Sequence, residues 1–370
     1  MKRVLIRPSF ADWEANRLFT QGTSYGGLYR DAFSLWKKNA YKNGFQIDTW
    51  DMAPLDEADV LWFLDLPSTR REFEKIIAQL KPSCSLVLQH LESPIFSWAP
   101  LMGENLRDFN LFLTYQHEPV TTKSRLTINY RLPHPLNKSS HNEPFEKRKG
   151  LVVLNSNIVD GLWAIRQKGI AGLPFFGSFL SGWSIDPSRM RSRISGELYS
   201  ARRSLLREAE NGKADFVDVF GPGWQGEKIS WCGAYPNRPY RCARGLTNIP
   251  KPILLGHYRF ALAYENFRGD FGYISEKILD CFCAGTVPVY LGDERIGEFI
   301  DPKAFVDARQ FKTSRDLLTY LANCSDAEWQ EMRSAGQAFL SSKQAECFSN
   351  EKFSQLMILA LNNKVFYSET

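Results

Sequence analysis

Glu276 and Lys277 follow Ser275 at the start of an apolar helical pattern. Ser275 is a good N-cap, and the pattern runs to Gly285, a residue type that commonly ends helices. A cation in the first turn opposes the helix dipole, so Lys277 makes sense if an anion lies beside it. Backbone N–H groups at the helix start would complete the cradle for that anion. Glu276 suits the dipole and could accept ribose hydroxyls. A solvated helix start with an arbitrary lysine is the alternative.

The residues before this helix place polar groups where open α/β folds bind ligands. The apolar run 260–264 ends abruptly at Glu265 and Asn266, and a glycine-containing loop then leads to Tyr273. The order strand, loop, helix gathers polar side chains at the end of the strand and the start of the helix. The stretch 258–308 therefore predicts a ligand site at a sheet edge.

The same stretch resembles the donor-binding motif of the α1,3-fucosyltransferases, the family 10 glycosyltransferases. Its residues read YENFRGDFGYISEKILDCFCAGTVPVYLG, followed by DPKAFV at 301–306. The family reads approximately F-x-L-x-F-E-N, then G-Y-[VI]-[TS]-E-K-[IL], A-G-[TS]-V-P-[IV]-x-x-G and P-x-x-[FS]-[IV]. The loop 266–273 is one residue longer than in some relatives, and Phe267 replaces the usual small residue. These departures bear on the conformation of the loop.

The resemblance implies an inverting enzyme that uses GDP-β-L-fucose. The donor-binding residues that it implies are Arg202, Asn266, Tyr273, Glu276 and Lys277. In the family a single arginine contacts the diphosphate, and Arg202 matches it on a basic helical stretch, with Arg203 and Arg193 as alternatives. Arginine suits the role because its planar fork pairs with two phosphate oxygens. For any one of these arginines, a solvated basic helix face explains the pattern equally well.

A candidate general base lies in the first half of the chain. The predicted strand 84–89 is followed by His90, and then by Glu92-Ser93-Pro94. A glutamate just past a strand end, fixed by a Ser-Pro turn, can project into a site and accept a proton. The resembling family has Glu-Ser-Pro here, and its glutamate is the proposed base, which implies that Glu92 is catalytic. His90 is the rival base.

The sequence offers no recognisable metal or dinucleotide site. It contains no Asp-x-Asp pair, no C-x-x-C and no Cys/His cluster, so we expect no metal site and no required cofactor, with divalent cations at most stimulatory. Residues 221–226 match G-x-G-x-x-G, but polar and proline-rich sequence follows where a helix should begin. We interpret them as a turn.

The alternation of predicted elements indicates an α/β fold of two domains. Expected strands cover 2–7, 58–66, 84–89, 111–115, 151–155, 216–220, 258–264, 287–291 and 305–308. Expected helices cover 69–80, 188–211, 314–322, 326–342 and 350–362, besides the helix after Ser275. A polar stretch, 123–149, reads as a linker. The resemblance implies a GT-B architecture, two Rossmann-like doubly wound domains facing across a cleft. We expect an acceptor-side domain at 1–148, with the C-terminal helix 346–370 packing back on it, and a GDP-fucose-binding domain at 149–345.

Composition narrows the class of protein and its partners. The net charge of +5 suits an anionic substrate and is too small and diffuse to argue for nucleic acid. No stretch approaches 18 apolar residues, and the N-terminus lacks a signal-peptide pattern. The seven scattered cysteines indicate reduced thiols. We therefore expect a bacterial-type soluble member in the cytoplasm, able to contact the inner membrane peripherally.

The acceptor and the linkage stay open at this stage. The expected product carries fucose on O3 of an N-acetylglucosamine or glucose unit, and α1,4 and α1,2 linkages are the alternatives. The acceptor would be an oligosaccharide or glycoconjugate, with lipopolysaccharide O-antigen as one candidate, bound partly by the loop 9–29. A related transferase for another nucleotide sugar, or a non-catalytic glycan-binding protein of the same fold, remains an alternative function.

Overall fold

A computed structural model shows a chain that divides into two compact units. The first comprises Met1–Pro135, Phe175–Arg193 and Glu346–Thr370, and the second comprises Leu136–Pro174 and Ile194–Ala345. The first of the three stretches of this unit ends at Pro135, whereas the sequence-based boundary lies after residue 148, and the third stretch contains the C-terminal residues. The structure describes residues 1–20, 27–93, 95, 97, 103–117, 126–139, 143–158, 182–183, 196–226, 239–269 and 272–363.

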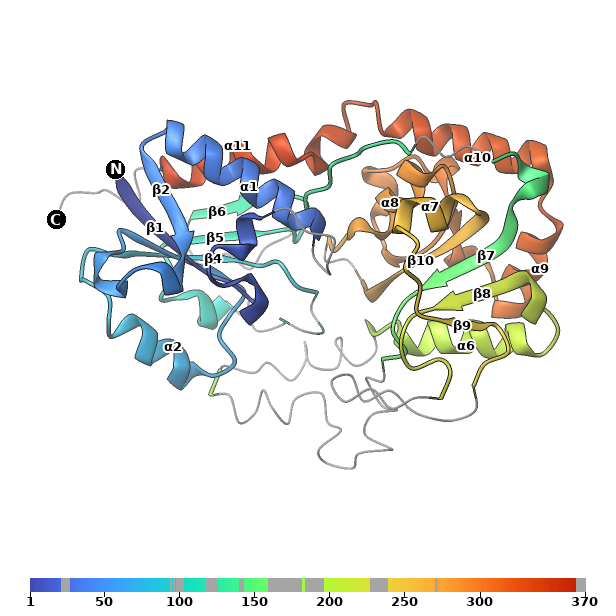
Figure 1. The fold of residues 1–370 in the computed structure, drawn as a ribbon, viewed down its shortest axis with the longest axis horizontal. Helices are drawn as coiled ribbons and strands as arrows, with labels where there is room; N and C mark the ends of the chain where they lie inside the picture. Colours follow the sequence, from blue (N-terminus) through green and yellow to red (C-terminus); the bar gives the residue numbers. More distant parts are fainter. Residues whose placement is uncertain are drawn as a thin grey trace. The chain divides into compact units, whose positions relative to one another are not determined.

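The first unit is built on a six-stranded parallel sheet (Figure 1). Its strands, in spatial order, are β2 (Phe45–Thr49), β1 (Lys2–Arg7), β3 (Val60–Leu64), β4 (Ser85–Gln89), β5 (Leu111–Thr114) and β6 (Leu126–Asn129). Every residue of β3 and β4 is buried. Parallel strands covered on both faces read as such continuous apolar runs, which is why both were predictable from the sequence.

Helices cover this sheet, and one of them comes from the end of the chain. They are α1 (Gly27–Lys42), α2 (Arg70–Ile77) and α11 (Asn350–Leu361). Helix α11 lies along α1 (Figure 1), where the rings of Phe33 and Phe353 are 5.3 Å apart and the amide of Asn39 donates to the hydroxyl of Ser354 at 2.9 Å. The last described helix is therefore part of the first unit's core.

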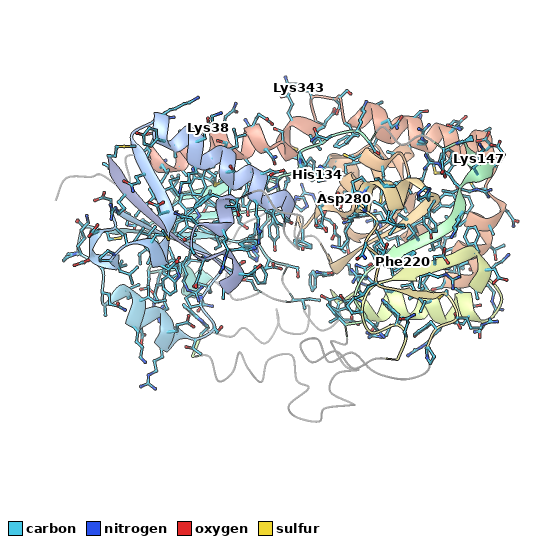
Figure 2. The ribbon with its side chains drawn as sticks, in the orientation of Figure 1. Lys38, His134, Lys147, Phe220, Asp280 and Lys343 are labelled. Atoms are coloured by element: carbon cyan, nitrogen blue, oxygen red, sulfur yellow. The ribbon has the colours of Figure 1, made fainter. Side chains whose placement is uncertain are left out.

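The second unit has its own six-stranded parallel sheet. Its strands, in spatial order, are β12 (Val306–Asp307), β11 (Val287–Asp293), β10 (Tyr258–Gly269), β7 (Lys149–Leu154), β8 (Val217–Phe220) and β9 (Ala243–Gly245). Its helices are α6 (Tyr199–Glu210), α7 (Lys251–Gly256), α8 (Glu276–Ala284), α9 (Ser314–Asn323) and α10 (Asp326–Phe339). Figure 2 labels Phe220 at the end of β8 and Asp280 on α8.

Alternation along the strands divides the second unit's interior between the two faces of the sheet. Leu151 and Val153 of β7 join a buried cluster with Leu205 of α6 and Leu317 of α9. Residue Val152, on the other face, contributes to a pocket together with side chains of α7 and α8. The carboxyl ends of β7 and β10 therefore lie between two helical layers.

The sequence-based predictions hold for most elements and fail for some. The strands expected at 2–7, 84–89 and 111–115 are confirmed within a residue. The linker interpretation of 123–149 was wrong, because β6 lies inside it; as an edge strand it is only partly buried and gives no apolar run. The sequence reasoning also missed α1, β2, β9 and α7. Of the helix expected at 188–211, α6 forms the C-terminal half, and residues 188–195 lie outside the described residues.

Candidate functional site

The strand order of the second sheet reverses direction at its two central strands, β7 and β10. From β7 the chain passes through α6 to β8 on one side and later through α7 to β10 on the other side. Such a switch in strand direction opens the space between the carboxyl ends of the two central strands, here β7 and β10, where open α/β sheets bind ligands. The polar residues Glu265 and Asn266 lie near this end of β10.

Glu265 is the buried centre of this edge. Its side chain is fully buried; one carboxylate oxygen accepts the backbone N–H of Ser275 at 2.8 Å and the other accepts the Ser275 hydroxyl at 2.7 Å. Ser275 is the N-cap of α8, and its hydroxyl oxygen faces the N–H of Lys277. Gly285 ends the helix in the left-handed conformation at φ 64°. The expected caps are thus confirmed, and Glu265 joins the strand end to the helix start.

The Lys277 ammonium group completes this cluster. Its Nζ lies 3.2 Å from a carboxylate oxygen of Glu265 and 3.0 Å from the hydroxyl of Ser275, and its side chain is 15% exposed. A lysine has three N–H donors, and these two contacts use two of them. One donor therefore remains to meet an anion at the start of α8.

Arg202 reaches the same strand end from α6 and is almost fully buried. Its Nη2 donates to the backbone oxygens of Tyr264 and Glu265, both at 2.6 Å, and to Oδ1 of Asn266 at 3.0 Å. Its Nε is buried without a partner among the described residues. Burial lowers the pKa of Arg202 from 12.5, and the guanidinium lies over the ring of Tyr199. Arg202 therefore brings a fixed positive charge to the end of β10 and holds Asn266 in place.

The alternative arginines differ from Arg202 in their surroundings. Arg203 is buried and donates to the backbone oxygen of Ile158 and to the hydroxyl of Ser200, away from β10. Arg193 lies outside the described residues. Arg202 is the one of these arginines for which the structure gives hydrogen bonds to residues at the carboxyl end of β10, among the contacts described.

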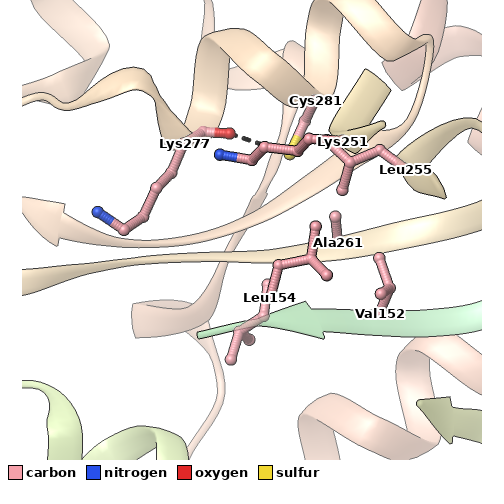
Figure 3. A pocket seen from close by; sticks show the side chains of 8 residues that line it. Val152, Leu154, Lys251, Leu255, Ala261, Lys277 and Cys281 are labelled. Carbon is pink, nitrogen blue, oxygen red and sulfur yellow. Dashed lines mark hydrogen bonds between the residues drawn. The ribbon is translucent and has the colours of Figure 1, made fainter. Parts of the chain in front are cut away.

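A network of opposite charges surrounds Glu276 in the first turn of α8. Although burial opposes its ionisation, Lys277 and Lys251 lower the pKa of Glu276. Lys251, at the start of α7, forms a salt bridge with Asp280 and lies 3.8 Å from Glu276, and these carboxylates raise its pKa. Figure 3 shows a pocket beside this network, with Lys251 and Lys277 on one side and the apolar side chains of Val152, Leu154 and Ala261 on the other. It is lined by Val152, Leu154, Lys251, Leu255, Ala261, Leu262, Lys277 and Cys281.

Two further loops contact the ends of strands at this edge of the sheet. Asp293, at the end of β11, accepts hydrogen bonds from the N–H groups of Gly272 and Arg295. Gly272 directly precedes Tyr273, whose side chain is buried. Residues 221–226 form a turn after β8, as expected. Gly221 has φ 130°, and a Cβ there would lie 2.4 Å from the backbone oxygen of Asn155, so only glycine fits.

Glu92 lies in the first unit, just beyond β4, and its backbone is held on both sides. Its N–H donates to both carboxylate oxygens of Asp65 at 3.2 Å, and its carbonyl oxygen accepts the hydroxyl of Tyr115 at 2.6 Å. Asp65 directly follows β3, is 5% exposed, and also accepts the N–H of Leu91 at 3.1 Å. Burial raises the pKa of Asp65 to about 6 despite these hydrogen bonds.

His90 is fully buried beneath this loop. Its Nε2 lies 2.8 Å from the backbone oxygen of Ser97, and because a carbonyl only accepts, Nε2 carries the proton. The ring stacks on Tyr115 at 4.6 Å, and burial lowers the pKa of His90 to about 4. His90 is therefore a neutral support of the loop in this structure and does not reach its surface.

The structure brings together some of the expected site residues and adds others. Arg202, Asn266 and Lys277 converge on the carboxyl end of β10, Glu276 begins α8, and Glu92 lies in the other unit. Sequence reasoning missed Glu265, Lys251 and Asp65. Glu265 was visible as the charged residue that ends an apolar strand, and Asp65 as its counterpart near the end of the strand expected at 58–66. Lys251 gave no such signal.

Comparisons with known proteins agree with this geometry. Residues 217–333 match the family described as glycosyltransferase family 10 (fucosyltransferase), C-terminal domain. An α-(1,3)-fucosyltransferase, FucT, of Helicobacter pylori is 36% identical over 71 residues, which are 19% of this chain and 15% of that protein. An α-(1,4)-fucosyltransferase of Arabidopsis thaliana is 31% identical over 72 residues, 20% of this chain and 18% of that protein. The alignments thus span less than a fifth of either relative.

Solved structures match over the whole chain at the level of the fold. An α1,3-fucosyltransferase crystallised with GDP-fucose has a TM-score of 0.51 at 13% identity, covering 100% of this chain and 93% of its own. Anabaena Alr3699/HepE in complex with UDP-glucose has a TM-score of 0.52 at 11% identity, covering 98% and 99%. These matches confirm the expected α/β, GT-B class. No helix in the described part of the chain is long and apolar enough to cross a membrane.

Proposed function

We propose that the protein is an inverting α1,3-fucosyltransferase, because residues 217–333 match the C-terminal domain of the family 10 glycosyltransferases. It transfers L-fucose from GDP-β-L-fucose to O3 of an N-acetylglucosamine or glucose unit of an acceptor glycan. The observation that carries the proposal is the cluster of Glu265, Ser275 and Lys277. This cluster lies within the matched range and leaves one ammonium donor for an anion at a helix start.

The donor is held by the edge of the second sheet. The third N–H of Lys277 donates to a diphosphate oxygen, and the charge of Arg202 favours the same group, with Nε as its remaining buried donor. Asn266 contributes hydrogen bonds near the phosphates. Glu276, kept ionised by Lys277 and Lys251, accepts ribose hydroxyls, and Tyr273 orients the sugar. Fixed cations of this kind stabilise the charge that grows on a departing diphosphate.

Glu92 acts as the general base. As the acceptor oxygen forms its bond to the anomeric carbon, the hydroxyl proton passes to the Glu92 carboxylate. The bond between that carbon and the GDP oxygen breaks on the opposite face, through an oxocarbenium-like transition state, so a β-linked donor gives an α-linked product. The charge on GDP is met by protein groups, and no metal is required. The described cysteines form no disulfide with one another, which favours a cytoplasmic location.

A donor and acceptor screen tests the proposal. The purified protein is incubated with GDP-fucose, GDP-mannose or UDP-glucose and a panel of glycans that includes N-acetyllactosamine, lactose and O-antigen oligosaccharides. We expect transfer from GDP-fucose alone, with an α1,3 linkage established by NMR. Transfer from another nucleotide sugar would replace the proposed donor. Glycan binding without transfer from any donor would identify a binding protein that keeps the fold.

A further inference from the structure

The backbone of Glu92 is clamped by two buried side chains from neighbouring strands. Asp65 follows β3 and accepts the Glu92 N–H, while Tyr115 follows β5 and donates its hydroxyl to the Glu92 carbonyl at 2.6 Å. Both peptide groups that flank the Cα of Glu92 are therefore fixed by groups 27 and 23 residues away in the sequence. A side chain that leaves a Cα held in this way starts from a defined position.

Asp65 makes this contact from a backbone conformation that is rare for a residue other than glycine. Its φ is 61°, in the left-handed region that non-glycine residues rarely adopt, and its own N–H donates to the backbone oxygen of Gln89 at 2.9 Å. The hydroxyl of Ser9 lies 3.1 Å from the carboxylate oxygen Oδ2. Strained backbone and a buried carboxylate each cost free energy, and both persist where the surrounding structure enforces them, often at functional sites.

We propose that Asp65 is a positioning residue for the general base, acting by holding the backbone of Leu91 and Glu92 from the end of β3. This inference rests on the proposed function, in which Glu92 takes the acceptor proton. A misplacement of about 1 Å can reduce turnover about 100-fold without touching the reacting atoms. Loss of the Asp65 contact therefore lowers kcat and leaves donor binding, which belongs to the other unit, unchanged.

The ionisation of Asp65 gives this clamp a pH dependence. An ionised carboxylate accepts all its donors, whereas the protonated group carries an O–H and has fewer lone pairs for the N–H groups of Leu91 and Glu92. Burial raises the pKa of Asp65 to about 6, so the clamp loosens as the pH falls below that value. No lysine or arginine of the described chain pairs with Asp65. The titratable groups around it are Glu92, His90, Tyr115 and Tyr130, with Tyr29 facing Tyr115.

The test compares Asp65→Asn with Asp59→Asn, a matched control at the opposite end of β3, where Asp59 accepts from Arg3 and Lys81. For each variant kcat, KM and GDP affinity are measured from pH 4.5 to 8, per folded molecule as determined by circular dichroism. We expect Asp65→Asn to lower kcat about 10- to 100-fold, to keep KM for GDP-fucose and GDP affinity within about twofold, and to move the acid limb of kcat to lower pH. Asp59→Asn should keep the wild-type kcat and acid limb.

Glu92→Gln, measured in parallel, distinguishes a failure of the proposed general base from a failure of the positioning role of Asp65. If Glu92→Gln keeps turnover, the assignment of the base fails and this inference with it. If Glu92→Gln is inactive but Asp65→Asn shows the wild-type kcat and acid limb, the positioning role alone is overturned. Should Asp65→Asn not fold, Tyr115→Phe tests the other side of the clamp. It should lower kcat about tenfold with GDP affinity unchanged, and a wild-type kcat would overturn the clamp.

Discussion

Each of the two sheets places a buried carboxylate at its carboxyl edge, but the charges are compensated differently. Glu265 in the second unit accepts from Ser275 and forms an ion pair with Lys277. Asp65 in the first unit accepts from the backbone of Leu91 and Glu92, and no cation in the described part of the chain pairs with it. A carboxylate held by dipoles alone pays the desolvation cost of its charge, which is why its pKa rises to about 6.

The difference fits the chemistry proposed for each edge. A site for a diphosphate needs permanent positive charge, and the Glu265–Lys277 pair keeps a lysine ordered at the start of α8. A site for a general base benefits from little fixed positive charge nearby, because a neighbouring cation would make the base weaker. Backbone hydrogen bonds from Glu92 to Asp65 hold the base in place without adding a cation.

The largest effect on activity is expected from a substitution at the carboxyl edge of the first unit's sheet. Glu92→Gln should reduce kcat by about 10²–10⁴, because the acceptor hydroxyl loses its proton acceptor, while GDP affinity stays at the wild-type value. Initial rates and calorimetric titration with GDP check both parts. Near-wild-type turnover would place the base elsewhere.

Neutralising the second unit's carboxylate should chiefly affect stability. Glu265→Gln removes the salt-bridge partner of Lys277, whose side chain is only 15% exposed, and breaking such a pair costs about 3–5 kcal/mol. The free energy of unfolding in urea measures this. Glu294→Gln, at an exposed position near the end of β11, is the control and should change it by less than about 0.5 kcal/mol. Equal values for both variants would show that the ion pair contributes nothing.

The role of the cation itself is tested by Lys277→Ala. It should weaken GDP binding about 10- to 100-fold, the value of a charged hydrogen bond, and leave guanosine binding nearly unchanged. Lys149→Ala, at the amino end of β7 and 66% exposed, should alter neither. Equal losses for guanosine and GDP would mean that Lys277 does not contact the phosphates.

Replacing Asp65 by asparagine should change how the free energy of unfolding depends on pH. Its pKa rises from 3.8 to about 6 on folding, so the folded state favours the protonated form, and the stability this contributes is present below about pH 4 and lost as the pH rises through 6. Relative to Asp65→Asn, the wild-type protein should lose up to about 3 kcal/mol of unfolding free energy between pH 4 and pH 7. Urea denaturation of both proteins at pH 4 and pH 7 measures the difference between their free energies of unfolding. If this difference is the same at both pH values, the pKa of Asp65 is not raised on folding.

The smallest effect is expected from chelation. Transfer should continue in excess EDTA, because Lys277 and Arg202 supply the positive charge that a metal ion supplies in other glycosyltransferases. Modest stimulation by divalent ions is compatible with this view, since they also bind released GDP. Complete loss of activity, restored by one equivalent of a single metal ion, would refute the mechanism.

The elements that the sequence determined by itself are those with local causes. Ser275 caps α8 and Gly285 ends it, because capping and the left-handed conformation depend on a few neighbouring residues. The buried strands β3 and β4 were visible as apolar runs, and the motif around Glu276 and Lys277 predicted a ligand site at the edge of the second sheet. The edge strand β6 and the helix α1 carried no comparably strong local signal.

Only the tertiary structure decided which distant groups meet. The order of the strands brings Asp65 to the backbone of Glu92, and the path of β10 brings Glu265 to Lys277. The tertiary structure also separates two neighbouring arginines, because Arg202 of α6 donates to Asn266 and Arg203 donates to the backbone oxygen of Ile158. Such contacts follow from sheet topology, and a pattern of neighbouring residues does not encode which strand will lie beside which.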